Sequence, residues 1–351
     1  MRTIKVTASK SYDVLVGRKL LQELGVQAKK VTKAQKIALV SDSNVWPIYG
    51  DRATSSLKEV GFSEVSTFVF PSGEESKNGD TYLSLLNFLA EEKLTRSDCI
   101  VALGGGVVGD MAGFVAATYL RGVDYIQVPT TVLAAVDSSV GGKTAIDLPS
   151  GKNLAGAFYQ PKLVLCDIDT LDTLPEDIFC DGCAEIIKYG ILYDPQLFAH
   201  LQERGLNFDR EAVISRCIEL KRDVVAADEF DLGERQKLNL GHTIGHSVEA
   251  NSHYTISHGK AVAIGMAVVS RAAAKNDLCT SDTAKDIESI LKTFSLPIST
   301  TNSAASIYQS ALSDKKRFGD SINLIVPTEI GKCVIHRVTT EELKTFIKAG
   351  L

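Results

Sequence analysis

The chain has 351 residues, of which 44% are hydrophobic and 23% charged, and its formal net charge is −5 at pH 7. This length and composition exclude a single small domain, a disordered chain and a membrane-embedded protein, and they predict two domains with sizeable apolar cores. A negative chain without a block of basic residues also argues against nucleic acid as a partner.

Short apolar strands alternate with helices through the first half of the chain. Buried strands are predicted from Lys36 and over residues 65–70, 99–103, 125–129 and 162–167. Leu, Phe and other apolar residues at helical spacing predict helices over residues 81–92 and 107–118. The alternation predicts an α/β fold in which residues 1–171 form a doubly wound, mostly parallel sheet domain that is Rossmann-like.

Strand signals nearly vanish beyond residue 171. Helical patterns cover residues 184–192, 210–225 and 261–275, and a single late strand is predicted at 322–326. Residues 172–351 are therefore expected to form an α-helical domain. The default position for an active site is the cleft between two such domains.

A glycine-rich segment, Gly104-Gly105-Gly106-Val107-Val108-Gly109-Asp110, follows a predicted strand and opens a predicted helix. Glycines at this place let backbone N–H groups approach a pyrophosphate, and the helix start adds positive potential. The same glycines can also serve only to make a tight turn between strand and helix. The motif by itself fits both interpretations.

Histidines cluster between residues 242 and 258, a segment that holds four of the six in the chain. His242 and His246 are four residues apart and share one face of a helix, which suits zinc; a pair of hydrogen-bonded helix histidines is the alternative. Spacing alone does not choose among the candidate ligands Glu185, Glu249, His242, His246, His253 and His258.

Cationic and amide side chains near glycine turns predict a pocket for a phosphate or carboxylate, because such anions need several converging donors. Each of these side chains taken singly is as readily a solvated surface group. The residues in question are Arg121, Asp137, Lys143, Lys152, Asn153, Lys188, Lys221, Arg235 and Asn239.

Six segments, read in order, resemble the motif series of the 3-dehydroquinate synthase family, which belongs to the sugar phosphate cyclases. They are RGVDYIQVPTTVLAAVDSSVGGKTAID, GKNLAGAFYQP, AEIIKYG, LNLGHTIGHSVE, HGKAVAIGM and DKK. The resemblance implies an NAD- and zinc-dependent carbon–oxygen lyase, with Co²⁺ as an alternative metal. Its implied reaction converts 3-deoxy-D-arabino-heptulosonate 7-phosphate to 3-dehydroquinate and phosphate by transient oxidation, elimination, re-reduction and aldol closure. This is a step of the shikimate pathway to chorismate and the aromatic amino acids.

The resemblance also implies that the domain of residues 1–171 binds NAD, that the domain of residues 172–351 binds metal and substrate, and that individual residues have the following roles. The metal ligands would be Glu185, His242 and His258. Catalytic roles would fall to His246, Lys143, Lys188, Arg235 and Asn239. NAD would contact Asp42, Glu74, Lys77, Gly104, Gly105, Gly106, Val107, Gly109, Asp110, Thr130, Thr131, Lys143, Lys152, Thr170 and Thr173. Substrate would contact Arg121, Asp137, Lys143, Lys152, Asn153, Lys188, Lys221, Arg235, Asn239, Lys315 and Lys316. Asp231 stands where the family has a glutamate.

Three alternatives share parts of this pattern: another sugar phosphate cyclase, a metal-dependent polyol dehydrogenase of the glycerol dehydrogenase type, and an inactive nucleotide-binding protein. The resemblance further implies a homodimer. The first ten residues lack an apolar signal segment and no later run reaches the roughly 20 apolar residues of a spanning helix, so a cytoplasmic protein with a small-molecule substrate is expected.

Overall fold

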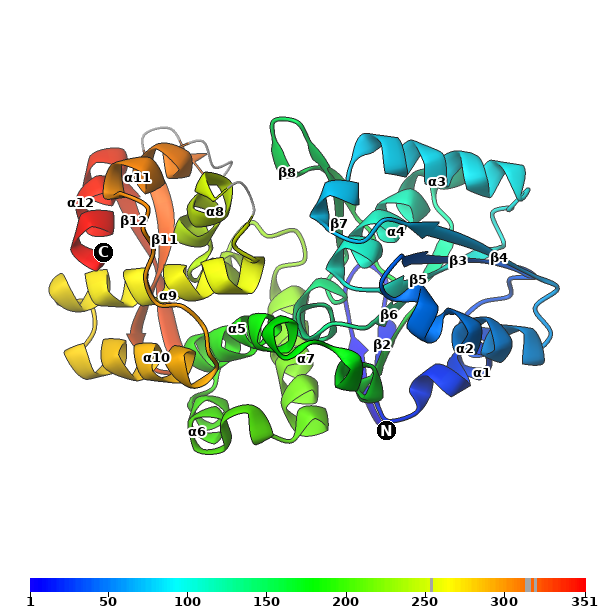
Figure 1. Cartoon of the computed structure of the whole chain (residues 1–351), viewed down its shortest axis with the longest axis horizontal. Coiled ribbons are helices and arrows are strands. Elements are labelled where there is room, and N and C mark those ends of the chain that lie inside the picture. Colours follow the sequence, from blue (N-terminus) through cyan, green and yellow to red (C-terminus); the bar gives the residue numbers. More distant parts are fainter. Residues whose placement is uncertain (253–254, 313–316, 319–320) are drawn as a thin grey trace. The chain divides into compact units, whose positions relative to one another are not determined.

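The computed structural model describes residues 1–252, 255–312, 317–318 and 321–351 (Figure 1). It consists of two compact units: unit 1 contains Met1–Leu174 and Arg210–Phe230, and unit 2 contains Pro175–Asp209 and Asp231–Leu351. The sequence-based division after residue 171 differs from this one, because residues 210–230 return to unit 1 and the first crossing follows Leu174.

Unit 1 is built on a seven-stranded sheet. Its strands, in spatial order, are β1 (Arg2–Val6), β2 (Tyr12–Gly17), β9 (Leu163–Asp167), β6 (Asp124–Pro129), β5 (Cys99–Gly104), β3 (Lys36–Asp42) and β4 (Glu64–Phe70). All neighbouring pairs are parallel except β1 with β2, which confirms the mostly parallel sheet. The strands β1 and β2 were not predicted from the sequence.

Helices cover both faces of this sheet, because alternate residues of each buried strand point to opposite sides. On one face Ile37 and Leu39 of β3 belong to an apolar cluster with residues of α1 (Leu24–Val31) and α2 (Trp46–Glu59). On the other face Ala38 and Val40 belong to a cluster with residues of α3 (Gly79–Glu91) and α4 (Gly106–Thr118). The unit is therefore doubly wound, as predicted.

A hairpin of β7 (Lys143–Leu148) and β8 (Gly151–Phe158) packs against α4. A Cβ on Gly113 of α4 would lie 2.4 Å from Thr144 Cγ2, so this glycine permits the close approach. The helix α7 (Arg210–Ala227) also belongs to unit 1 and contacts β1 and β2.

Unit 2 contains the helices α5 (Glu176–Tyr193), α6 (Pro195–Arg204), α8 (His242–Asn251), α9 (His258–Lys275), α10 (Ser281–Thr293), α11 (Ala304–Leu312) and α12 (Thr340–Gly350). The helix α9 lies at its centre and contacts α5, α8, α10 and α12 (Figure 1). None of the helices that the structure describes combines the length and the apolar character that a bilayer crossing requires.

Unit 2 also holds an antiparallel sheet of β10 (Arg317–Phe318), β11 (Ser321–Glu329) and β12 (Lys332–Thr339). The expected single strand over residues 322–326 is the centre of β11. The partner strand β12 was not predicted, because its sequence KCVIHRVT mixes charged and apolar residues without a continuous apolar run.

Candidate metal centre and cofactor site

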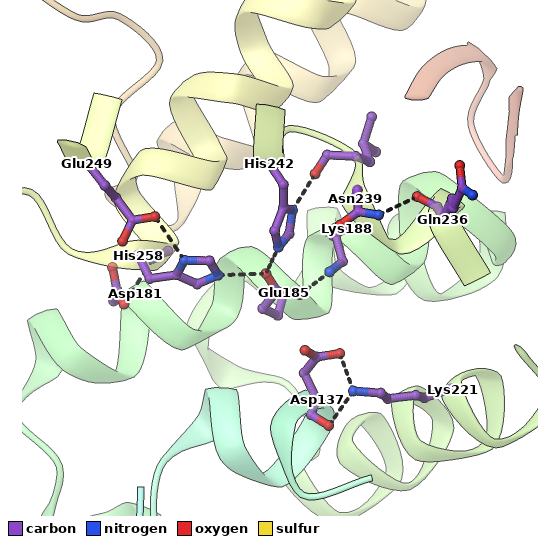
Figure 2. Close-up of polar contacts among 12 residues, drawn as sticks. Asp137, Asp181, Glu185, Lys188, Lys221, Gln236, Asn239, His242, Glu249 and His258 are labelled. Atoms are coloured by element: carbon purple, nitrogen blue, oxygen red, sulfur yellow. Dashed lines mark hydrogen bonds and ion pairs between the residues drawn. The ribbon is translucent and has the colours of Figure 1, made fainter. Parts of the chain in front are cut away.

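Three side chains of unit 2 converge although they come from different helices. Glu185 lies in the middle of α5, and His242 and His258 are the first residues of α8 and α9. Figure 2 shows both imidazole rings directed at the Glu185 carboxylate. One ligand atom of each residue lies within 4.8 Å of those of the other two.

The spacing of these atoms fits a tetrahedral metal. His242 Nε2 and His258 Nε2 each lie 3.7 Å from Glu185 Oε1. Two ligands at zinc distances of about 2.0–2.1 Å with a tetrahedral angle between them are about 3.4 Å apart. A carboxylate and two imidazoles leave the fourth position open, which is the donor set of catalytic rather than structural zinc sites.

Hydrogen bonds orient both rings. His242 Nδ1 donates to the Leu240 carbonyl oxygen at 3.1 Å, and His258 Nδ1 donates to Glu249 Oε2 at 3.2 Å. These oxygens accept, so a proton is placed on each Nδ1, and each Nε2 faces Glu185. Partners of this kind are typical of histidines that bind metals.

Glycines explain how α8 and α9 come close enough for this arrangement. A Cβ on Gly265 of α9 would lie 1.9 Å from the Gly241 carbonyl oxygen, just before α8 begins. A Cβ on Gly245 of α8 would lie 2.9 Å from the Ala261 carbonyl oxygen. The two helices therefore pack backbone to backbone, and the ring centroids of His242 and His258 are 5.2 Å apart.

The charge at this cluster favours a cation. Desolvation by the surrounding protein lowers the pKa of His258. Hydrogen bonds to Glu185 and Glu249 and the charges of these two carboxylates outweigh desolvation and raise the pKa to about 10. The side chain of Lys188 is buried like that of Glu185, and the two form an ion pair across one turn of α5. Two carboxylates thus stabilise positive charge at the place where the three predicted ligands meet.

The other predicted residues of unit 2 lie on neighbouring elements. His246 is one turn along α8, with its ring centroid 5.4 Å from that of His242. Arg235 and Asn239 lie on the short 3-10 helix Glu234–Asn239, and the Arg235 side chain is buried. A second group of possible ligands, His246, Glu249 and His258, shares His258 with the first. Because Glu249 already accepts the Nδ1 proton of His258, the first group suits a metal better.

The predicted cofactor residues of unit 1 lie mostly at the carboxyl edge of the parallel sheet. Asp42 ends β3, and its Oδ1 accepts from the backbone N–H groups of Asn44 and Val45 at 2.8 and 2.9 Å. Gly104 ends β5, which pairs with β3. The two strands form the point at which the chain order reverses, where ligands of such sheets commonly bind. Glu74, Thr130, Thr131, Thr170 and Thr173 follow the ends of β4, β6 and β9.

The glycine motif also has a packing role. Gly105 is the N-cap of α4, and Gly106 is its first residue. A Cβ on Gly104 would lie 2.5 Å from Val108 Cγ2, and one on Gly109 would lie 2.6 Å from Gln127 Oε1 of β6. These close approaches support the turn interpretation, while the partly exposed start of a 13-residue helix is also consistent with the pyrophosphate interpretation.

A buried cation organises the predicted residues next to that helix start. Lys77 Nζ lies 2.6 Å from Asp110 Oδ2 and donates to Asn153 Oδ1 at 2.6 Å. Burial by itself lowers the pKa of Lys77, but the Asp110 and Glu74 carboxylates raise it above its ordinary value. Lys152 Nζ lies 3.5 Å from Glu74 Oε1, so this ion pair holds the hairpin of β7 and β8 against the turn that follows β4.

Two predicted substrate residues meet in unit 1 despite their separation in sequence. Lys221 of α7 donates to Asp137 Oδ1 at 2.8 Å and also to the Asp137 carbonyl oxygen (Figure 2). The exposed Lys143 begins β7. Arg121 follows the C-terminal end of α4 and comes just before β6 begins, so it lies at the opposite edge of the sheet from Asp42 and Gly104, which end their strands. Lys315, Lys316 and His253 lie outside the described residues.

Asp181, which was not predicted from the sequence, contacts the backbone at the start of α9. Its position four residues before Glu185, on the same face of α5, is the signal that could have indicated a part in the site. That signal is weak, because a carboxylate on a helix is most often solvated.

Known proteins resemble this chain over its whole length. A family model described as 3-dehydroquinate synthase N-terminal matches residues 67–181, and one described as 3-dehydroquinate synthase C-terminal matches residues 182–317. The 3-dehydroquinate synthase of Clostridium acetobutylicum is 42% identical over 355 residues, with 99% of each chain covered.

Two solved structures show the same architecture. 2-Deoxy-scyllo-inosose synthase, complexed with carbaglucose-6-phosphate, NAD⁺ and Co²⁺, has a TM-score of 0.90 at 26% identity over 100% of both chains. 2-Epi-5-epi-valiolone synthase from Streptomyces hygroscopicus, with NAD⁺ and Zn²⁺ bound, has a TM-score of 0.87 over 100% of this chain and 99% of that one. Its identity of 24% supports likeness of fold alone.

Proposed function

The chain belongs to the 3-dehydroquinate synthase family, and from that premise we propose that it converts 3-deoxy-D-arabino-heptulosonate 7-phosphate to 3-dehydroquinate and inorganic phosphate. The substrate is assigned from the relatives that are 42% identical over nearly the full chain. The structural observation that supports a metal-assisted reaction is the convergence of Glu185, His242 and His258, with both rings oriented through Nδ1.

We assign zinc to Glu185, His242 and His258 of unit 2. We assign NAD to the predicted cofactor residues at the carboxyl edge of the parallel sheet in unit 1. The presence of NAD⁺ with Zn²⁺ or Co²⁺ in two solved structures of the same fold supports these assignments. When bound, zinc supplies a Lewis acid for substrate hydroxyls, and NAD supplies a hydride acceptor that is restored within each turnover.

The chain's own side chains bind the anionic groups of the substrate and move protons. Arg235 and Lys188 are buried cations suited to a phosphate or carboxylate, and the Asn239 amide adds a donor. We assign Lys143, Lys152, Asn153 and Lys221 to the same task. A phosphate held in this way can take the proton at carbon 6 with its own oxygen, which reduces the need for a protein base. His246 is assigned to proton transfer beside the metal ligands.

The deciding experiment incubates the purified protein with the heptulosonate phosphate, NAD and zinc, and follows phosphate, cyclic product and NADH together. We expect phosphate and 3-dehydroquinate in equal amounts without net NADH. Net NADH accumulation would instead support a polyol dehydrogenase, and turnover of a different phosphosugar would support another cyclase. If neither product nor NADH forms with any of these substrates, the chain is an inactive nucleotide-binding protein.

Two histidine variants test the assignment of the metal ligands. His258→Ala should abolish turnover, whereas His200→Ala on α6 of the same unit should leave it within about twofold, because His200 is outside both ligand groups. Full activity in His258→Ala contradicts the ligand role.

We further propose a homodimer located in the cytoplasm, by analogy with the family. Sedimentation equilibrium of the purified protein tests the dimer. A monomer at micromolar concentration would contradict it.

A further inference from the structure

The carboxylate of Asp181 receives the first backbone donors of α9, although it lies on a different helix. Its Oδ1 accepts from the Lys260 N–H at 2.8 Å, and its Oδ2 accepts from the Gly259 N–H at 3.2 Å. The Ser257 hydroxyl donates to the same carboxylate. The first N–H groups of a helix have no partners inside that helix. The Asp181 carboxylate, which belongs to α5, therefore caps the start of α9.

Local sequence alone would place a different residue in that role. Ser257 is the N-cap residue of α9 and is of the type that commonly caps its own helix. Its side chain is instead used to bind Asp181. A Cβ on Gly259 would lie 1.9 Å from the Asp181 carbonyl oxygen, so only glycine permits α9 to start this close to α5. The contact between the two helices therefore depends on both residues.

This contact lies next to the metal ligands on both elements. Asp181 precedes Glu185 by one turn of α5, and His258 is the first residue of α9 (Figure 2). The contact of the start of α9 with Asp181 thus fixes the backbone of His258 relative to α5, the helix that carries Glu185. Glu249 fixes the orientation of the His258 ring, because its Oε2 accepts from Nδ1 of that ring.

We infer that Asp181 is a positioning residue of the metal centre, setting the distance between Glu185 and His258 through the backbone of α9 while Glu249 sets the orientation of the His258 ring. The inference rests on the proposed assignment of a metal to Glu185, His242 and His258. Partners that orient metal ligands typically change metal affinity by 10–100-fold when they are mutated.

The test measures zinc affinity of the full chain by competition with a chromogenic chelator, and the visible absorption of the Co²⁺-substituted protein. We expect Asp181→Ala to weaken zinc binding by about 10–100-fold and to change the intensity of the Co²⁺ bands. Asp181→Asn, which keeps the shape and one acceptor, should fall between the wild type and Asp181→Ala. Glu249→Gln should weaken binding by a comparable factor while the contact at the start of α9 remains.

Asp194→Ala is the matched control, because Asp194 caps α6 of the same unit through the N–H groups of Gln196 and Leu197. It removes a capping carboxylate from a helix that carries none of the three ligands, so zinc affinity should stay within about threefold of the wild type. Thermal unfolding of each metal-free variant shows whether the chain folds.

The outcomes separate this inference from the assignment on which it rests. If wild type binds zinc tightly and His258→Ala does not, the metal centre stands. Asp181→Ala must then lose more affinity than Asp194→Ala. If Asp181→Ala loses no more than that control, Asp181 acts only as a helix cap and the inference is overturned. If wild type and His258→Ala bind zinc equally, the proposed metal centre itself is wrong.

Discussion

Lys77 carries a buried positive charge on which the predicted cofactor residues of unit 1 depend. Replacing it with methionine leaves the partly buried Asp110 carboxylate without its ammonium partner. Breaking a fully buried ion pair from one side costs about 3–5 kcal/mol, so Lys77→Met should lower the free energy of unfolding by up to that amount. Urea unfolding without NAD measures the loss.

The double variant Lys77→Met with Asp110→Asn distinguishes lost charge pairing from lost packing. It should recover most of the stability, because no uncompensated charge remains. An equal loss in the single and double variants would contradict the ion-pair explanation. Lys58→Met, at an exposed position of α2, serves as the control for the substitution itself.

The sequence indicated the three residues that converge in unit 2 only through the family resemblance. Helical spacing alone favoured His242 and His246 together, since residues four apart share a face. The choice of His258 depends on the start of α9 packing against α5, and no local pattern encodes that contact. Asp181 was missed for the same reason, because its partners lie 78 and 79 residues away in the chain.

At the scale of single elements, Asp98 joins the beginnings of two central strands. Its carboxylate accepts from the backbone N–H groups of Thr95 and Lys36 at 2.8 and 2.9 Å. Burial opposes ionisation, but these hydrogen bonds outweigh it, so the pKa of Asp98 is lowered. A lowered pKa in the folded state stabilises the fold above the unfolded pKa of about 3.9, and that contribution is lost as pH falls through the folded value.

Asp98→Asn should therefore cost about 1.5–3 kcal/mol at pH 7, since hydrogen bonds to a charged group are lost. The difference from wild type should shrink as the pH falls below about 4, where the Asp98 carboxylate of the unfolded chain begins to protonate while that of the folded chain is still ionised. Urea unfolding at pH 7, 5 and 3.5 measures it. A difference independent of pH would contradict the role of the charge, and Asp51→Asn at an exposed position of α2 is the control.

The close packing of α8 on α9 depends on Gly265. An added Cβ would lie 1.9 Å from a backbone oxygen, which cannot move without shifting the start of α8 and with it His242. Gly265→Ala should cost about 1–3 kcal/mol of unfolding free energy and weaken zinc binding. Chelator competition and thermal unfolding measure both effects.

Gly79→Ala on α3 is the comparison, because a Cβ there would meet nothing within 4 Å. It should leave zinc affinity unchanged. Unchanged zinc affinity in Gly265→Ala as well would show that the packing of α8 on α9 does not set the position of His242.

Helices and strands were predictable where their burial produces a simple pattern of apolar residues in the sequence. The strands β3, β5, β6 and β9 are buried along almost their whole length, so their apolar runs were visible. The hairpin of β7 and β8 was interpreted only as anion-binding loops, because GKNLAGAF is rich in glycine and polar residues and is largely exposed. Its strands pair with each other rather than with the main sheet, which local sequence does not reveal.

For the whole molecule, the two proposed ligands are assigned to different units and should protect different amides. Zinc should slow hydrogen exchange at the starts of α8 and α9 and in the middle of α5. NAD should slow it after β3 and at the start of α4. Each ligand at 100 times its Kd adds about 2.7 kcal/mol to the stability of the state that binds it.

His258→Ala gives the matched comparison for this mapping. It should abolish the zinc-dependent protection and keep the NAD-dependent protection, because no predicted NAD contact lies in unit 2. Loss of both would contradict the assignment of the two ligands to separate units.

The division of the chain was predictable only in outline. Chain length and the loss of strand signals after residue 171 indicated two halves, but α7 was assigned to the second half because its pattern is helical like its neighbours. Lys221 lies on that helix and is buried against Asp137 of unit 1. Which unit a helix packs on depends on such distant partners, and periodicity carries no information about them.

The return of α7 has a practical consequence for dissecting the gene. The polypeptide passes from one unit to the other after Leu174, after Asp209 and after Phe230. A fragment that stops at residue 174 would lack the helix that neutralises Asp137 and packs on the first two strands. A chimaera that exchanges the nucleotide half with a relative must therefore transplant two separate stretches, and a single crossover would join mismatched partners.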